Sequence, residues 1–120
     1  MIKSSKPRKQ RKFRYNAPLH LRKHFVHAHL SKEAATKLNI KRRTIQVSRG
    51  DTVKIMSGSR KGKAGKVSKV DTVRGFLFID GITRKNVRGR ELQIPIRPNS
   101  VYITDVNMND KMRAAKLTKG

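Results

Sequence analysis

The chain has 120 residues, the length of one domain, and carries 31 Lys+Arg against 7 Asp+Glu, a formal net charge of +24. A charge of that size opposes a compact state unless a polyanion neutralises it, which points to a membrane surface or a nucleic acid. No apolar run reaches the roughly 18 residues of a spanning helix, and Trp is absent, so nucleic acid is favoured. The absence of cysteine excludes disulfides and thiolate metal sites.

Residues 1–15 are predicted to form a basic extended arm. Seven of the first fourteen residues are basic, and few are apolar. Such a segment buries too little apolar surface to offset the entropy of ordering, so we expect it to be disordered in isolation.

Residues 16–43 are predicted to contain two short α-helices. Apolar side chains recur at helical spacing over about 17–30, which predicts an amphipathic helix. Ser31 is a typical N-cap for a second helix, which we expect to stop at Asn39.

Three histidines, His20, His24 and His27, would lie on one face of the first of these helices, and His29 follows. A pair of histidines four residues apart can bind zinc, but no cysteine or nearby acid supplies the remaining ligands. We therefore expect no metal, and we favour a helix face that lies on RNA with its imidazoles near phosphates.

From Thr44 onward the hydrophobic period is two, which is typical of strands. Five or six short strands within about 60 residues predict a mainly β fold, a small closed or nearly closed barrel over residues 44–106. Pro95 limits its segment to an edge strand or an irregular extension. Residues 107–120 would form a short basic C-terminal tail with one or two frayed helical turns. The predicted interior is Val53, Ile55, Val67, Val70, Phe76, Phe78, Ile82, Val101 and Ile103.

Phe76 and Phe78 share one strand face and have a second possible role, since exposed aromatic rings can stack on bases. Because the surrounding sequence GFLFID is typical of a buried strand, we expect both rings to lie in the core. Without a stacking surface, recognition would be of folded RNA through its backbone and shape.

The stretch SGSRKGKAGKV, residues 57–67, interleaves glycines with cations. It is not a Walker A loop, because Gly58 and Gly62 are too close together and Lys63 is followed by Ala64 and a strand. Two interpretations remain: a solvated hairpin whose glycines supply positive φ, or a loop that clamps a nucleic-acid backbone. The cations favour the second.

Residues 83–91, TRKNVRGRE, form another basic loop between strands, which the same barrel would present beside the first. The predicted RNA contacts are Lys6, Arg8, Lys9, Arg11, Lys12, Arg14, Arg42, Arg43, Ser57, Gly58, Ser59, Arg60, Lys61, Gly62, Lys63, Gly65, Lys66, Arg84, Lys85, Asn86, Arg88 and Arg90. The carboxylates are few and scattered, and no spacing supports a catalytic triad, so an enzyme is the weakest interpretation.

The run VSRGDTVKIMSGSRKGKAGKVSKVD, residues 47–71, resembles a KOW motif, which occurs in SH3-like barrels of ribosomal proteins and transcription elongation factors. FLFIDGITRKNVR and IPIRPNSVYITDVNM, together with the basic N-terminal extension, resemble the universal large-subunit ribosomal protein family twenty-four. The extension is similar to its archaeal and eukaryotic form, called twenty-six in eukaryotes.

This resemblance implies an SH3-like barrel and a non-enzymatic, cytoplasmic constituent of the large ribosomal subunit. Such a protein binds large-subunit (23S) rRNA through phosphate and shape contacts, joins early in assembly and sits near the polypeptide exit tunnel. The implied partners are that rRNA and neighbouring large-subunit proteins, and we expect no cofactor, no membrane insertion and no homo-oligomer.

Two other classes compete with the ribosomal one. A KOW-type transcription elongation factor normally carries a polymerase-binding α/β domain, which residues 1–43 do not resemble. An SH3-like chromatin protein would coat duplex DNA, whereas a long basic arm suits threading through folded RNA.

Overall fold

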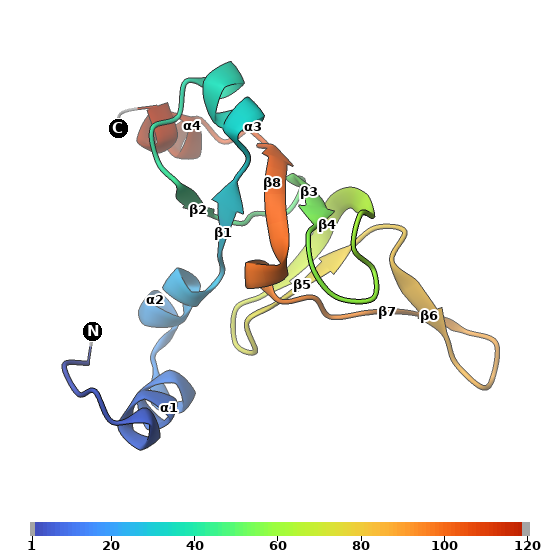
Figure 1. Cartoon of the computed structure of the whole chain (residues 1–120), viewed down its shortest axis with the longest axis horizontal. Coiled ribbons are helices and arrows are strands. Elements are labelled where there is room, and N and C mark those ends of the chain that lie inside the picture. Colours follow the sequence, from blue (N-terminus) through green and yellow to red (C-terminus); the bar gives the residue numbers. More distant parts are fainter. Residues whose placement is uncertain (1, 119–120) are drawn as a thin grey trace.

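The computed structural model describes residues 2–118, in which most of the strands form one mixed sheet (Figure 1). The strands are β1 (His27–Leu30), β2 (Thr44–Gln46), β3 (Thr52–Ile55), β4 (Ala64–Asp71), β5 (Phe76–Ile79), β6 (Thr83–Lys85), β7 (Glu91–Gln93) and β8 (Val101–Asp105). The helices are α1 (Pro7–Asn16), α2 (Leu19–Arg22), α3 (Lys32–Leu38) and α4 (Lys111–Thr118), with short 3-10 helices η1 (Lys23–Phe25) and η2 (Pro98–Ser100). Met1 of the predicted arm and residues 119–120 of the predicted tail lie outside the described residues.

The sheet has the order β2-β1-β8-β3-β4-β5, and β6 pairs only with β7. Neighbouring strands are antiparallel except β1 and β8, which run parallel. The period-two segments that predicted strands are confirmed as β2, β3, β4, β5 and β8. The chain is therefore mainly β, as predicted.

The predicted closed or nearly closed barrel is not formed, because β2 and β5 are the two edges of the sheet. The free edge of β5 takes only an isolated bridge, in which Leu77 and Ile96 exchange backbone hydrogen bonds of 2.7 and 2.9 Å. Two residues earlier, the Ile94 N–H donates instead to the Ile82 carbonyl oxygen at 3.5 Å, so the chain leaves the edge of β5 after this one bridge. Pro95 lies in the irregular stretch between β7 and the bridge, and the pairing is too short to close the sheet.

The predicted count of two α-helices is also wrong, since residues 2–118 contain four. One is α1, inside the segment expected to be an extended arm, and another is α4, in the predicted tail. Pro at the first position of α1 favours a helix start because its missing N–H is not needed there.

The helix predicted over residues 17–30 is only half correct. Its first part forms α2 and η1, which end at Phe25, and its second part is the strand β1. Ala28 and Leu30 are buried at alternating positions between β2 and β8, so pairing within the sheet overrides the helical spacing. The second predicted helix is confirmed as α3: the Ser31 Oγ accepts from the Ala34 N–H at 3.2 Å.

The core prediction holds for six side chains and fails for two. Val53, Ile55, Val67, Ile82, Val101 and Ile103 are buried, and Val70 is half-buried. Phe76 and Phe78, however, are only half-buried, and β5 buries Leu77 and Ile79 instead. Both faces of β5 are apolar, so alternation alone could not tell which one faces the core.

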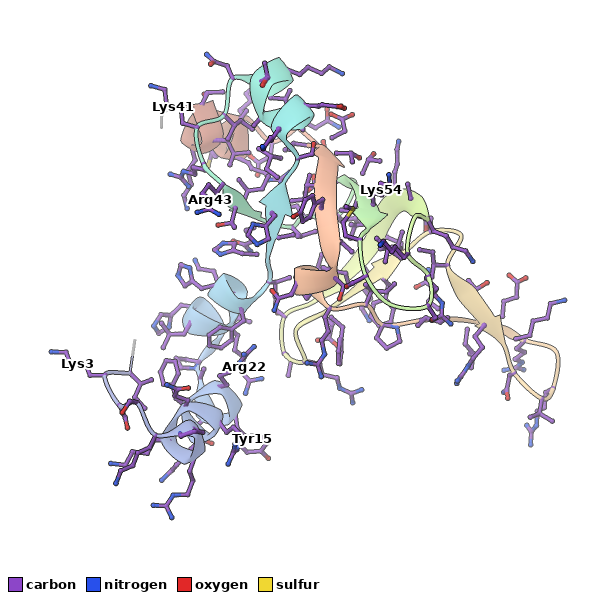
Figure 2. All side chains as sticks on the ribbon, in the orientation of Figure 1. Lys3, Tyr15, Arg22, Lys41, Arg43 and Lys54 are labelled. Carbon is purple, nitrogen blue, oxygen red and sulfur yellow. The ribbon has the colours of Figure 1, made fainter. Side chains whose placement is uncertain are left out.

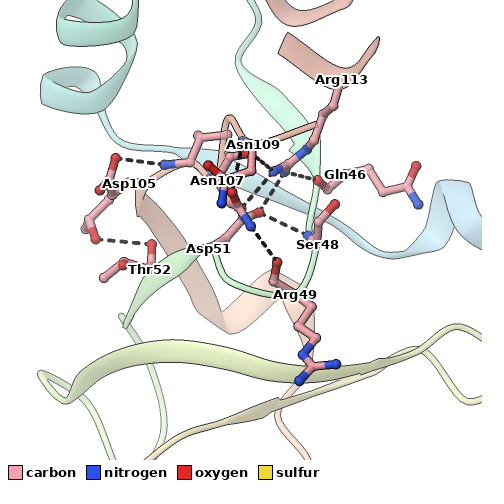
Figure 3. Close-up of polar contacts among 11 residues, drawn as sticks. Gln46, Ser48, Arg49, Asp51, Thr52, Asp105, Asn107, Asn109 and Arg113 are labelled. Atoms are coloured by element: carbon pink, nitrogen blue, oxygen red, sulfur yellow. Dashed lines mark hydrogen bonds and ion pairs between the residues drawn. The ribbon is translucent and has the colours of Figure 1, made fainter. Parts of the chain in front are cut away.

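The one fully buried charged side chain within residues 2–118 is Asp51 (Figure 3). Its Oδ2 accepts from the Ser48 N–H at 3.0 Å, and its Oδ1 accepts from the Asn107 N–H at 2.9 Å. The Arg113 guanidinium donates to both oxygens, at 2.8 and 2.7 Å, and also to the Gln46 carbonyl oxygen at 3.0 Å. This network fastens α4 to the segment between β2 and β3.

Replacing Arg113 with Met should lower the free energy of unfolding by about 3 kcal/mol, because it leaves a buried carboxylate without its countercharge. Lys111→Met is the matched control, since Lys111 is an exposed cation on the same helix and has no ion-pair partner among the described residues. Chemical denaturation of the three proteins measures the difference. Equal loss in both variants would contradict the role assigned to Asp51.

Gly65 of β4 is required by packing. A Cβ built on it would lie 2.6 Å from the Asp80 carbonyl oxygen and 2.9 Å from the Ile79 Cγ2. Gly65→Ala should therefore cost about 1–3 kcal/mol of unfolding free energy through overpacking. Ala64→Ser, at the exposed neighbouring position, should be nearly neutral in the same denaturation experiment. A neutral Gly65→Ala would show that β5 moves aside freely.

Candidate nucleic-acid interface

Helix α1 presents cations to solvent without burying any residue. Six of the predicted RNA contacts belong to it or cap it, and all six are exposed: Lys6, Arg8, Lys9, Arg11, Lys12 and Arg14. Its first turn has no acid, and cations three and four residues apart on a helix repel each other. The helix is thus suited to bind a polyanion on more than one face.

Arg22 holds this helix against the rest of the molecule, a role that its sequence context did not predict. Its guanidinium donates to the backbone carbonyl oxygens of Ala17, at 2.7 Å, and of Val73 in the β4–β5 turn. Phe13 of α1 also packs edge-on against Phe25, with ring centroids 6.3 Å apart. Arg22 also donates to the Tyr15 carbonyl oxygen, so it links the end of α1 to the β4–β5 turn, while the ring contact joins α1 to η1.

The β3–β4 loop is a closed hairpin. The Ile55 N–H donates to the Lys63 carbonyl oxygen and the Gly62 N–H donates to the Ile55 carbonyl oxygen, both at 2.8 Å. Gly58 and Gly62 have φ of +95° and +93°, and a Cβ on either would meet nothing within 4 Å. These glycines supply positive φ, and they also leave backbone open that a phosphate group can approach.

The side chains of this loop are mostly exposed. Arg60 is half-buried and donates to the Ser59 Oγ at 3.2 Å. The exposed members of the predicted set are Ser57, Gly58, Ser59, Lys61, Gly62, Lys63 and Lys66. Gly65 differs from the other two glycines, because its lack of a side chain is explained by packing inside the protein.

The second basic loop is the tip of the β6–β7 hairpin, which projects away from the six-stranded sheet (Figure 1). The Asn86 N–H donates to the Arg90 carbonyl oxygen at 2.7 Å and closes the tip. Every residue from 83 to 93 is exposed. Arg84, Lys85 and Arg88 thus lie on a separate arm of the molecule and not on the rim of a barrel.

The remaining predicted contacts, Arg42 and Arg43, lie in the exposed connection between α3 and β2. The Arg43 carbonyl oxygen accepts from the Leu30 N–H at 2.9 Å, which ties this connection to β1. Figure 2 shows Lys41 beside α4, Arg43 beside β2, and Lys3 at the opposite end of the molecule, beyond α1. The predicted contacts are therefore spread over several surfaces and are not gathered in one patch.

The histidines do not share one helix face as predicted, because His20 is in α2, His24 in η1 and His27 in β1. The structure instead brings His24 and His27 together, with ring centroids 5.8 Å apart, at a cleft of about 580 Å³. Lys23 and Lys116 also line this cleft, and neither was predicted as a contact. Lys116 is far away in the sequence, so no local pattern could have linked it to the histidines.

Burial, and then the positive charges of His24, Lys116 and Arg42, lower the pKa of His27 below its ordinary value of 6.5. Within residues 2–118, no three His, Asp or Glu side chains gather where they could hold a metal ion. The helices of this part of the chain are also too short or too polar to cross a membrane.

The chain matches known families and proteins over nearly its whole length. A family model that describes the eukaryotic ribosomal proteins L26 and their archaeal counterparts, named L24, matches residues 4–119. The large ribosomal subunit protein uL24 of Methanospirillum hungatei is 48% identical over 115 residues, 96% of this chain and 94% of that protein. The uL24 proteins of Methanocella arvoryzae and Saccharolobus solfataricus are 42% and 46% identical, covering 99% and 97% of this chain and 94% and 96% of their own lengths.

Proposed function

The chain belongs to the family of eukaryotic L26 and archaeal L24 ribosomal proteins, and we propose that it binds large-subunit rRNA as a structural constituent of the large ribosomal subunit. Its relatives are ribosomal structural proteins, and it is not an enzyme. The protein is located in the cytoplasm, in the ribosome.

One observation carries the proposal of rRNA binding: the positive charge has almost no countercharge within the protein. Among residues 2–118 a single ion pair forms, between Arg113 and Asp51, although the chain has 31 Lys+Arg. The cations of α1, of the β3–β4 loop and of the β6–β7 hairpin are left facing solvent. A phosphate backbone supplies the missing negative charge and releases its own counterions on binding.

Each basic surface would contact RNA in a different way. Helix α1 is cationic on several sides and is proposed to thread between rRNA helices. The β3–β4 loop is proposed to act as a KOW-type contact, with a phosphate near the open backbone at Gly58 and Gly62. The β6–β7 hairpin would reach a separate stretch of RNA through Arg84, Lys85 and Arg88.

We extend the proposal to the timing and the place of binding. Contacts dispersed over the arm, the loop and the hairpin would tie together several segments of RNA, which suits a protein that joins early in assembly. A position near the exit of the polypeptide tunnel, beside other large-subunit proteins, is part of the same proposal.

Sucrose-gradient fractionation of a native lysate tests this function directly. The protein should sediment with the large ribosomal subunit and remain bound through a high-salt wash, because several separated phosphate contacts hold it. An unrelated basic protein added to the lysate serves as the control and should wash off. Sedimentation with RNA polymerase or with the nucleoid would overturn the proposal.

Lys61→Ala or Lys63→Ala should weaken rRNA binding and lower the slope of log K against log salt by about one each, because each lysine is proposed to neutralise one phosphate. Lys61→Arg keeps the charge and should keep the slope. Binding of a large-subunit rRNA transcript over a range of salt concentrations measures it. An unchanged slope in both alanine variants would make the β3–β4 loop a solvated hairpin only.

A further inference from the structure

The cleft beside His27 is bounded by three parts of the fold that are distant in sequence. They are η1, the β1–β2 pair with the connection before it, and α4. Each part contributes cationic or protonatable side chains, and together these are Lys23, His24, His27, Arg42, Arg113 and Lys116. Its volume of about 580 Å³ is ample for a phosphate group and its neighbouring riboses.

Among the described residues, the cationic side chains that line the cleft outnumber the carboxylates. Asp110 is the one carboxylate among the described residues that lines it, and its Oδ1 accepts from the Met112 N–H at 3.0 Å at the start of α4. Arg113 is held by the buried Asp51. Lys23, Arg42 and Lys116 have no carboxylate within ion-pair distance among residues 2–118.

These positive charges, together with burial, affect the protonation of His27. It is half-buried, and its ring lies against that of His24. The pKa of His27 is lowered mainly by burial and further by the positive charges of His24, Lys116 and Arg42. In the free protein this imidazole is therefore neutral at pH 7. An anion placed among these groups would reverse the charge effect.

We propose that this cleft binds a phosphodiester group of the rRNA backbone and that His27 takes up a proton when the phosphate enters. The proposal rests on the proposed function and adds to it a site away from the β3–β4 loop and the β6–β7 hairpin. The bound phosphate offsets the repulsion among Lys23, Arg42 and Lys116, and the imidazolium of His27 then donates to a phosphate oxygen. Binding at this site is therefore coupled to pH, whereas binding by the lysines of the β3–β4 loop is not.

The sign of the coupling follows from the pKa of His27. It is lowered in the free protein and raised in the complex, so the complex binds more protons and the affinity increases as the pH falls through the titration range of His27. Each unit by which RNA raises this pKa gives a tenfold rise in affinity across that range.

The test uses the full-length protein and a transcript of the large-subunit rRNA at constant ionic strength. Affinity is measured between pH 8 and pH 5.5, and proton uptake is measured by calorimetry at pH 6.5 in two buffers of different ionisation enthalpy. The wild-type protein should take up protons and bind at least about tenfold more tightly at the low end of the range. His27→Gln should remove most of both effects.

Matched controls come from the other histidines. His20→Gln and His29→Gln change exposed imidazoles that do not line the cleft, so both variants should keep the wild-type proton uptake. Lys116→Gln guards against a folding defect in the His27 variant, because Lys116 is exposed. It should raise the pKa of His27 in the free protein, reduce proton uptake and lower the salt slope by about one.

The two proposals fail in different ways. Salt-dependent rRNA binding with the same pH profile in wild type and His27→Gln would overturn the cleft and leave the proposed function standing. Absence of salt-dependent rRNA binding by the wild-type protein would overturn both. If inorganic phosphate alone, at matched phosphate concentration, raises the pKa of His27 as much as RNA does in an NMR titration, the cleft is a site for a free anion and its assignment to the RNA backbone is wrong.

Discussion

The buried carboxylate of Asp51 is the interaction on which the rest of the molecule depends. It receives hydrogen bonds from two backbone N–H groups and two guanidinium nitrogens, so every approach to it is filled from within the chain. An unpaired charge in that position would be among the most costly defects a small protein can carry. By holding Arg113, Asp51 also sets the position of α4, which forms one wall of the cleft beside His27.

The distribution of charge follows from this arrangement. One cation is neutralised inside the protein and nearly all the others face water, where they repel each other without a partner from the chain. A polyanion that binds only the folded state therefore stabilises it by mass action. In the proposed complex with rRNA, the surfaces that oppose folding of the free protein would be the surfaces that bind, and the RNA would stabilise the fold.

Much of the fold could be predicted from local pattern, and the failures have identifiable causes. Period-two spacing located five strands, and the Ser31 cap located α3, because both signals lie within a few residues. On β5 both faces are apolar, so only the sheet could decide that Leu77 faces inward. The strand β1 was mistaken for helix, since its partners β2 and β8 lie far along the chain.

The candidate RNA-binding surfaces likewise include features that local sequence predicts and features that only the fold brings together. That the cations of the arm, the β3–β4 loop and the β6–β7 hairpin are exposed could be predicted from sequence, because runs of Lys and Arg with glycine bury little apolar surface. The Arg22 contact to the β4–β5 turn, the pairing of Asp51 with Arg113 and the meeting of His24 with Lys116 all join residues far apart in the chain. Sequence patterns describe residues a few positions apart, so they could not predict these contacts.

The position of β8 has a consequence for how the chain folds as it is synthesised. This last strand lies in the middle of the sheet, between β1 and β3, and pairs parallel to β1. Until residue 105 has emerged, β1 and β3 have no common neighbour and each exposes an unpaired edge. The six-stranded sheet is thus completed only after residue 105 has been synthesised, whereas residues 1–15, the basic arm proposed to bind rRNA, emerge well before it.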